Sequence, residues 1–279
     1  MAELSPPNPA RERFAEIAQR ADEEIDLGEA ALWLAAESFP GLPVDAYLAK
    51  LDRIADGVLP ALQGVGLLEQ QVEALNREIF GAYGFHGARD DYYDPRNSFI
   101  NEVLDRKTGI PISLSVVYIE VARRVGLDAA GMNFPGHFLA RIGDDPIIVD
   151  AFEGRIATAR ECKTRLTAAL GADAELTPEL LAPAGNKSIL LRMLSNLKSI
   201  YASRREFEAA LACCDRGLLL VPDSPSELRD RGLIYHGLDC ARPALMDLER
   251  YLELDPEGEG AAAIRELVEQ LHQQVPSIH

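Results

Sequence analysis

The last third of the chain repeats itself with a period of 34 residues. When residues 188–222 are set against residues 222–256, nine of the 35 aligned pairs are identical. Five of these pairs are Tyr201/Tyr235, Ala210/Ala244, Leu211/Leu245, Leu220/Leu254 and Pro222/Pro256. Alanine lets two helix backbones approach closely, and proline ends a helix because it cannot continue the hydrogen-bond ladder. The pattern therefore predicts two antiparallel helix pairs.

The period and the residue positions of this repeat resemble those of the tetratricopeptide repeat. One position departs from the pattern, because Lys198 stands in the first unit where the small Gly232 stands in the second. A further helix over Gly260–Gln274 is expected to cap the array. Repeats of this kind imply a concave face that binds a helix or peptide of a partner protein.

Charge and cysteine usage exclude several classes of partner and cofactor. The chain has 28 Lys and Arg against 45 Asp and Glu, and its net charge of −17 repels phosphate backbones and anionic lipid. It contains no apolar run of the length of a membrane span. Its four cysteines form no Cys-x-x-Cys pair, so no zinc site is expected. We therefore expect a cytoplasmic protein with no nucleic acid, membrane, metal or cofactor partner.

The first eighty residues have the apolar spacing of amphipathic helices. Apolar side chains recur at intervals of three and four residues in four stretches: 14–25, Ala30–Ala36, Val44–Ile54 and Val72–Phe80. Residues 83–98 are rich in Gly, Asp and Pro, which indicates turns and a loop. The N-terminal region is therefore predicted to be mainly helical over residues 1–80.

The middle of the chain mixes helix and strand signals. The expected elements are two helices and two strands: Phe99–Leu104, Pro111–Val125, Ala130–Ile142 and Pro146–Phe152. Residues 164–186 are expected to form a linker with a short helix, because Pro178, Pro183 and Gly185 interrupt them. The predicted fold class is α+β, with a small antiparallel sheet in a core over residues 81–160. The predicted domains are 1–184 and the all-α repeats over 185–279.

Three positions in the core have the chain order of a nucleophile, a histidine and an acid. A helix that begins near Pro111 presents free N–H groups and partial positive charge, which favour an ionised nucleophile and a developing oxyanion. His137 on the next expected strand can accept a proton, and Asp150 on the strand after it can orient the imidazole. Papain-like and transglutaminase-like enzymes use this order.

The segment from Tyr92 to Phe152 resembles the bacterial SirB family. The resemblance rests on the run YYDPRNSFINEVLDRKTGIPISLSVVYIEVARRVGL, followed by FPGHFLARI and VDAFEG. Proteins of this family join a transglutaminase-like domain to C-terminal tetratricopeptide repeats, which is the order found in this chain. The resemblance implies a transglutaminase-like core of the cysteine-protease type.

Carried over to this sequence, the transglutaminase motif places its histidine at His137 and its aspartate at Asp150. The cysteine position falls on Pro111, or on Ser113 after an adjustment of two residues, and neither is a cysteine. All four cysteines lie later in the chain: Cys162, Cys213, Cys214 and Cys240. The resemblance therefore implies a site that lacks its usual thiol nucleophile.

Ser113 has two interpretations. It can be the nucleophile of a Ser–His–Asp triad with His137 and Asp150, or its hydroxyl can satisfy a free backbone group at the start of the helix. We prefer the second, since hydroxyls at helix starts are common and triads are rare. His137 likewise can be a catalytic base or a hydrogen-bonded core residue.

Four polar residues of the segment are cleft candidates by the pattern of the family: Asn97, Asn101, Glu102 and Arg106. Taken alone, they read as the polar face of a capped surface helix. The acidic residues Asp90, Asp91 and Asp94 lack the spacing of a calcium loop, so we interpret them as turn and capping carboxylates before Pro95.

Two functional hypotheses follow, and a purely structural scaffold is a weaker third. The first is a non-catalytic or vestigial transglutaminase-like protein that acts as a regulatory or protein-binding module through its cleft and repeats. The alternative is a hydrolase or acyltransferase that uses Ser113, His137 and Asp150 on an amide or ester. The missing cysteine favours the first, whereas His137 and Asp150 keep the second open.

Overall fold

The computed structural model describes residues 8–258 and 260–274. The chain divides into two compact units, Met1–Met193 and Leu194–His279. Helix α8 (Asn186–Ser203) runs through this division, and the domain boundary expected after residue 184 stays a prediction. Among the described residues, no helix has both the length and the apolar character needed to cross a bilayer.

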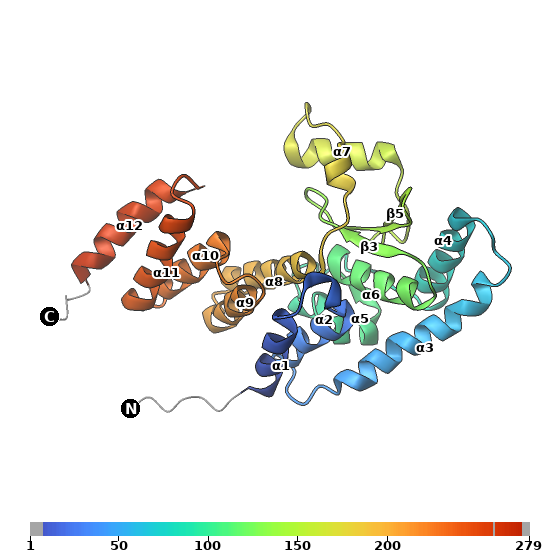
Figure 1. Cartoon of the computed structure of the whole chain (residues 1–279), viewed down its shortest axis with the longest axis horizontal. Coiled ribbons are helices and arrows are strands. Elements are labelled where there is room, and N and C mark those ends of the chain that lie inside the picture. The colour runs from blue at the N-terminus through green and yellow to red at the C-terminus, as the bar shows by residue number, and fades with distance from the viewer. Residues whose placement is uncertain (1–7, 259, 275–279) are drawn as a thin grey trace. The chain divides into compact units, whose positions relative to one another are not determined.

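The first unit opens with helices, as the apolar spacing predicts (Figure 1). These are α1 (Pro9–Ala18), α2 (Leu27–Ala36), α3 (Val44–Leu62) and α4 (Leu68–Asn76), followed by a π-helical turn over Arg77–Ala82. Two differences from the sequence prediction concern their ends. The stretch over 14–25 is not one helix, because a short 3-10 turn over Asp22–Glu24 separates α1 from α2. Helix α3 continues past the predicted end at Ile54, with Pro60 tolerated in its last turns.

Helix α6 (Pro111–Arg124) lies at the centre of the first unit. Twelve of its residues, from Pro111 to Ala122, are buried, so it is covered on all sides rather than on one face. It contacts α2, α3, the short helix α5 (Ile100–Arg106) and strands of the sheet. Its first residue is a proline, whose missing N–H would have no helical partner at that position.

The sheet has four antiparallel strands in the order β3-β4-β5-β6. They are β3 (Ala129–Met132), β4 (Leu139–Ile142), β5 (Ile147–Asp150) and β6 (Arg155–Ile156). A separate parallel pair joins β1 (His86–Gly87) to β2 (Thr108–Gly109). The small antiparallel sheet beside helices confirms the predicted α+β fold class.

The single strand predicted over Ala130–Ile142 is wrong. It is two strands, β3 and β4, and the chain turns between them. Pro135 has no N–H to offer a sheet ladder, and Gly136 adopts a positive φ of 68°, which suits a turn. His137 consequently lies in the connection just before β4, and its backbone N–H donates to the carbonyl of Phe134 at 3.0 Å.

Helix α7 (Ala159–Leu170) begins earlier than the linker and short helix predicted over 164–186. Thr158 and Glu161 form a capping box at its start, in which each side chain satisfies a backbone N–H of the other. A 3-10 turn over Pro178–Leu181 follows. Asp22 then accepts from the backbone N–H groups of Asn186 and Lys187 at 2.9 and 2.7 Å, and so caps the start of α8.

The repeat region consists of helices, as predicted. After α8 come α9 (Phe207–Leu220), α10 (Pro225–Gly237), α11 (Ala241–Leu254) and the final helix α12 (Ala261–Gln274). The described residues between 188 and 274, which omit residue 259, contain no strand. A Cβ atom on Gly232 would lie 2.7 Å from the Leu248 side chain, which explains the small residue at that position.

Lys198 stands at the equivalent position of the first repeat, where its long side chain is held by ion pairs. Its side chain is 8% exposed, and its Nζ lies 2.8 Å from Glu227 Oε1 and 2.7 Å from Asp230 Oδ2. Burial alone would lower the pKa of Lys198, but the two carboxylates outweigh this effect and raise it. The departure from the repeat pattern is thus a buried ion cluster between helices.

Candidate functional site

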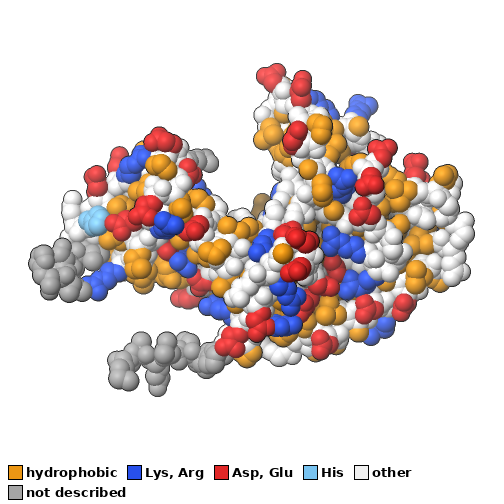
Figure 2. All heavy atoms as spheres, viewed as in Figure 1, with side chains coloured by type: hydrophobic (Ala, Val, Ile, Leu, Met, Phe, Trp, Pro, Cys, Tyr) orange, Lys and Arg blue, Asp and Glu red, His pale blue; other side chains and the backbone are white. Residues whose placement is uncertain are grey.

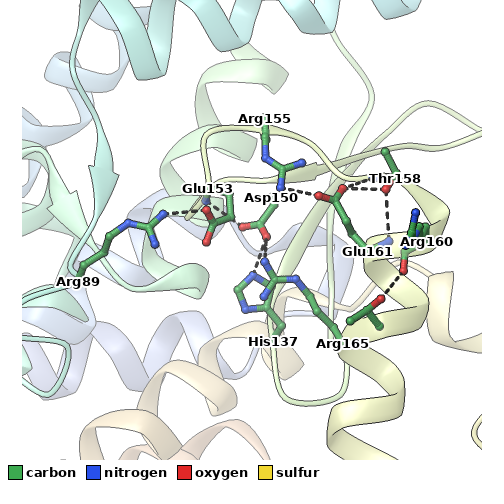
Figure 3. Close-up of polar contacts among 10 residues, drawn as sticks. Arg89, His137, Asp150, Glu153, Arg155, Thr158, Arg160, Glu161 and Arg165 are labelled. Atoms are coloured by element: carbon green, nitrogen blue, oxygen red, sulfur yellow. Dashed lines mark hydrogen bonds and ion pairs between the residues drawn. The ribbon is translucent and has the colours of Figure 1, made fainter. Parts of the chain in front are cut away.

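His137 and Asp150 form a buried hydrogen-bonded pair, as shown in Figure 3. His137 comes from the β3–β4 connection, and Asp150 is the last residue of β5. His137 Nε2 lies 3.1 Å from Asp150 Oδ2, and the two side chains are 8% and 3% exposed. The turn at Pro135 and Gly136 returns the chain toward the sheet, so the histidine reaches the end of a strand that follows it by thirteen residues.

Both oxygens of the Asp150 carboxylate are occupied by donors. Oδ1 accepts from the backbone N–H groups of Phe152 and Glu153, each at 3.1 Å. Oδ2 accepts from Arg165 Nη2 of α7 at 2.6 Å as well as from His137. Burial by itself raises the pKa of Asp150, but the bond and charge of His137, the Glu153 N–H and the Arg165 charge outweigh it and lower the pKa.

The imidazole of His137 is oriented by its surroundings. Because the ionised Asp150 can only accept, Nε2 of His137 carries a proton and donates it to this carboxylate. Within the described chain, Nδ1 has no hydrogen-bond partner. The ring of Phe152 meets the imidazole edge-on, with centroids 6.5 Å apart. Arg192 of α8 donates to the carbonyl of His137 at 2.7 Å, which fixes the backbone that supports the ring.

Ser113 has backbone partners. It is fully buried in the first turn of α6, and its Oγ donates to the carbonyl of Asn97 at 2.5 Å. The backbone N–H of Ile110 donates to the same Oγ at 3.1 Å. The structure thus brings His137 and Asp150 together and gives Ser113 the helix-start contacts of its structural interpretation.

Pro111 lies at the start of the same helix, two residues before Ser113, and is also buried. Its side chain is a hydrocarbon ring that can neither attack a carbonyl nor exchange a proton. The helix start thus offers partial positive charge and free N–H groups without a nucleophile at the position that the motif assigns.

A pocket of about 460 Å³ lies in the same unit. Its lining comes from β1, β2, the loop that follows β1 and the end of α5: His86, Gly87, Ala88, Arg89, Asp90, Asp91, Asn97, Arg106 and Thr108. Two of the cleft candidates, Asn97 and Arg106, therefore line a pocket. The other two, Asn101 and Glu102, lie on α5, where Asn101 is buried and Glu102 is half-buried.

The pocket adjoins the His137–Asp150 pair through Phe152 and Arg89. Arg89 Nη2 lies 2.7 Å from Glu153 Oε2, and its guanidinium lies 5.3 Å from the centre of the Phe152 ring. A Cβ on Gly87 would come within 2.7 Å of that ring, so the pocket wall packs directly on Phe152. Figure 3 shows Arg89 and Glu153 on one side of Asp150, with His137 and Arg165 beside the carboxylate.

The acidic run before Pro95 has the capping role expected for one of its members. Asp94 is buried and accepts from the backbone N–H of Arg96 at 2.9 Å. Its Oδ2 also accepts from Arg96 Nε at 2.8 Å. Asp90 and Asp91 are exposed.

Two arginines that shape the site were not identified from the sequence. Arg165 lies in the stretch predicted as linker, and Arg192 lies in the first repeat helix. They follow His137 by 28 and 55 positions and share no motif with it. Only the packing of α7 and α8 against the sheet connection reveals their partners.

Comparison with known proteins follows the same division of the chain. A family model described as the transglutaminase-like superfamily matches residues 45–195, and one described as a tetratricopeptide repeat matches residues 197–269. A UPF0162 protein of Xylella fastidiosa (strain Temecula1) is 39% identical over 250 residues, which cover 88% of this chain and 89% of that protein. No solved structure matches.

Two more distant relatives match with similar coverage. A UPF0162 protein of Pseudomonas aeruginosa is 32% identical over 234 residues, covering 84% of this chain and 86% of the relative. Protein SirB1 of Salmonella typhimurium is 29% identical over 237 residues, covering 84% and 88%. The resemblance seen between Tyr92 and Phe152 is confirmed by these matches: the chain belongs to the transglutaminase-like superfamily, together with the UPF0162 and SirB1 proteins, and its own C-terminal part is a tetratricopeptide-repeat region.

Proposed function

We propose that this chain is a non-catalytic protein that binds a protein or peptide partner and regulates it, with a transglutaminase-like domain that has lost its nucleophile. The observation that supports this most strongly is that the first turn of α6 holds no side chain available as a nucleophile. Pro111 has no reactive group, and the Ser113 hydroxyl is buried and donates to the Asn97 carbonyl at 2.5 Å. To attack a carbonyl, Ser113 would have to give up its buried hydrogen bonds with the Asn97 carbonyl and the Ile110 N–H.

The repeats supply the proposed partner surface. Tetratricopeptide units stack helix pairs into a concave face suited to a partner helix or peptide. The net charge of −17 favours a partner with basic residues, and Figure 2 shows acidic side chains spread over the face that it draws. All four cysteines are free thiols, which is consistent with the cytoplasmic location that we propose.

The second candidate is a hydrolase or acyltransferase, and one observation favours it. The His137–Asp150 pair keeps the geometry of a base and its orienting acid, with Nδ1 of the imidazole free of protein partners among the described residues. A core with no chemical role does not require this arrangement. The same pair is equally expected of a domain that lost only its nucleophile.

Turnover measurements separate the two candidates. The full chain, Ser113→Ala and His137→Ala are each incubated with p-nitrophenyl esters, peptide amides and a fluorophosphonate probe. We expect no turnover above buffer and no fluorophosphonate adduct on Ser113 in the wild type. Wild-type hydrolysis that both substitutions abolish would show that the chain is an enzyme and would refute the proposal.

A further inference from the structure

The pocket beside the His137–Asp150 pair contains an arginine, Arg106, whose side chain donates no hydrogen bond to the described residues. The Arg106 side chain is 31% exposed, and its closest carboxylate oxygen is Asp94 Oδ2, 4.0 Å from Nη2. That distance is too long for a hydrogen bond. Asp94 is already taken by Arg96, whose Nη2 lies 2.6 Å from the same oxygen.

Arg106 Nη1 is shielded from solvent and has no hydrogen-bond partner in the described chain. A guanidinium has five N–H donors in a planar fork that matches the two oxygens of a carboxylate. A shielded donor without an acceptor destabilises the folded state. A ligand that supplies the acceptor therefore binds with favourable free energy. Arg106 is therefore suited to an incoming anionic group with two oxygens.

Asn97 contributes an acceptor without a donor. It is fully buried, lines the same pocket and donates from Nδ2 to the carbonyl of Asp91 at 2.6 Å. Since a carbonyl can only accept, this bond fixes which end of the amide is nitrogen. The remaining atom, Oδ1, is shielded and has no donor among the described residues. The pocket thus combines unused donors on Arg106 with an unused acceptor on Asn97.

We propose that this pocket binds a carboxylate flanked by an N–H group, as found at the C-terminal end of a peptide. Arg106 pairs with the carboxylate, and Asn97 Oδ1 accepts the neighbouring amide N–H. A volume of about 460 Å³ admits one or two residues. The exposed carboxylates of Asp90 and Asp91, which also line the pocket, favour a basic residue just before the end. This inference rests on the proposed function only in taking the ligand to be a peptide.

Binding of two matched dipeptides to the full chain tests the proposal. N-acetyl-lysyl-alanine with a free carboxylate and the same dipeptide with a C-terminal amide are titrated by calorimetry. We expect the acid to bind about tenfold more tightly than the amide, since one charge-assisted pair is lost in the amide. Equal affinities for acid and amide, or no binding of either, would overturn the proposal.

Variants assign the effect to Arg106. Arg106→Gln is expected to weaken binding of the acid about tenfold and to leave the amide unchanged. Arg106→Lys keeps the positive charge but loses the planar pair of donors, so its affinity for the acid is expected to lie between those of the wild type and Arg106→Gln. Arg53→Gln removes the same charge from an exposed site on α3 and is expected to bind like the wild type. If Arg106→Gln binds the acid as tightly as the wild type does, Arg106 is not the residue that pairs with the carboxylate. The comparison of acid with amide uses only the wild type, so it tests the pocket even if a variant fails to fold.

A third ligand distinguishes the two sources of such a group. N-acetylalanine carries the carboxylate and the N–H but no preceding residue. If it binds as tightly as the dipeptide acid, the carboxylate chemistry holds and the natural ligand is a small acylated amino acid. If it binds more weakly, the ligand is a peptide end. Esterase or amidase turnover by the wild type refutes the proposed function without affecting this result.

Discussion

Arg165 and His137 share one acceptor, because both reach Oδ2 of Asp150, at 2.6 and 3.1 Å. The arginine comes from α7 and the histidine from the connection before β4, so the carboxylate links two elements that do not adjoin in sequence. The arginine charge helps to keep Asp150 ionised, and an ionised Asp150 holds the imidazole in one orientation. The pair is therefore a structural feature of the fold.

The stability of the first unit is expected to depend on pH through Asp150. Its pKa is lowered in the folded chain, so it stabilises the fold above the ordinary aspartate value of about 4. This stabilisation is lost as the pH falls through the lowered pKa, by up to about 1.4 kcal/mol per pH unit. In thermal melts between pH 3 and pH 6, the melting temperature of Asp150→Asn is expected to fall less on acidification than that of the wild type.

The control for this measurement is Asp173→Asn, which changes an exposed carboxylate elsewhere in the first unit. Its melting temperature is expected to fall on acidification by as much as that of the wild type. An Asp150→Asn profile that runs parallel to the wild-type profile would show that Asp150 is not the group responsible.

Two serines of α6 provide a matched test of the structural role assigned to Ser113. Both Ser113 and Ser115 are fully buried, but Ser113 Oγ bonds the Asn97 carbonyl and the Ile110 N–H, whereas Ser115 Oγ has no hydrogen-bond partner in the described chain. Ser113→Ala is expected to lower the free energy of unfolding by about 1–3 kcal/mol, because it removes two buried hydrogen bonds of the Ser113 hydroxyl.

Ser115→Ala removes an unpaired polar atom, so its unfolding free energy is expected to match or exceed that of the wild type. Urea denaturation of the three proteins measures the difference. Equal effects of the two substitutions would mean that the Ser113 hydrogen bonds contribute nothing to stability.

The ion cluster of the repeat region is expected to be sensitive to loss of its cation. Lys198→Met leaves Glu227 and Asp230 without their buried partner, and breaking such a pair costs about 3–5 kcal/mol. Arg242→Met changes an exposed cation of α11 and is expected to cost little. Circular dichroism melts at neutral pH compare the two. A Lys198→Met protein as stable as Arg242→Met would show that the cluster is energetically neutral.

The parts of the structure that the sequence predicts well are those with a regular local signal. The 34-residue repeat identifies the helix pairs, and the motif order identifies His137 and Asp150. The break in the predicted strand was missed because apolar residues continue on both sides of Pro135 and Gly136, although both residues favour a turn.

Long-range polar partners could not be predicted. Arg165 lies in a stretch where the breakers at Pro178, Pro183 and Gly185 suggested a linker, yet the capping box at Thr158 starts a regular helix before them. The ion partners of Lys198 are 29 and 32 residues away, and no periodicity connects them. Such contacts depend on how helices pack, which the one-dimensional pattern does not contain.

The account holds that the site lacks only a nucleophile, and Pro111→Cys tests this most directly. The variant and a control, Pro60→Cys at an exposed position of α3, are treated with p-nitrophenyl acetate, and the adducts are located by mass spectrometry. We predict no adduct in the wild type near the site, a rapid thioester at position 111, and its loss when His137→Ala is added. A position-111 cysteine that reacts no faster than the one at position 60, or a wild-type adduct on Ser113, would contradict the account.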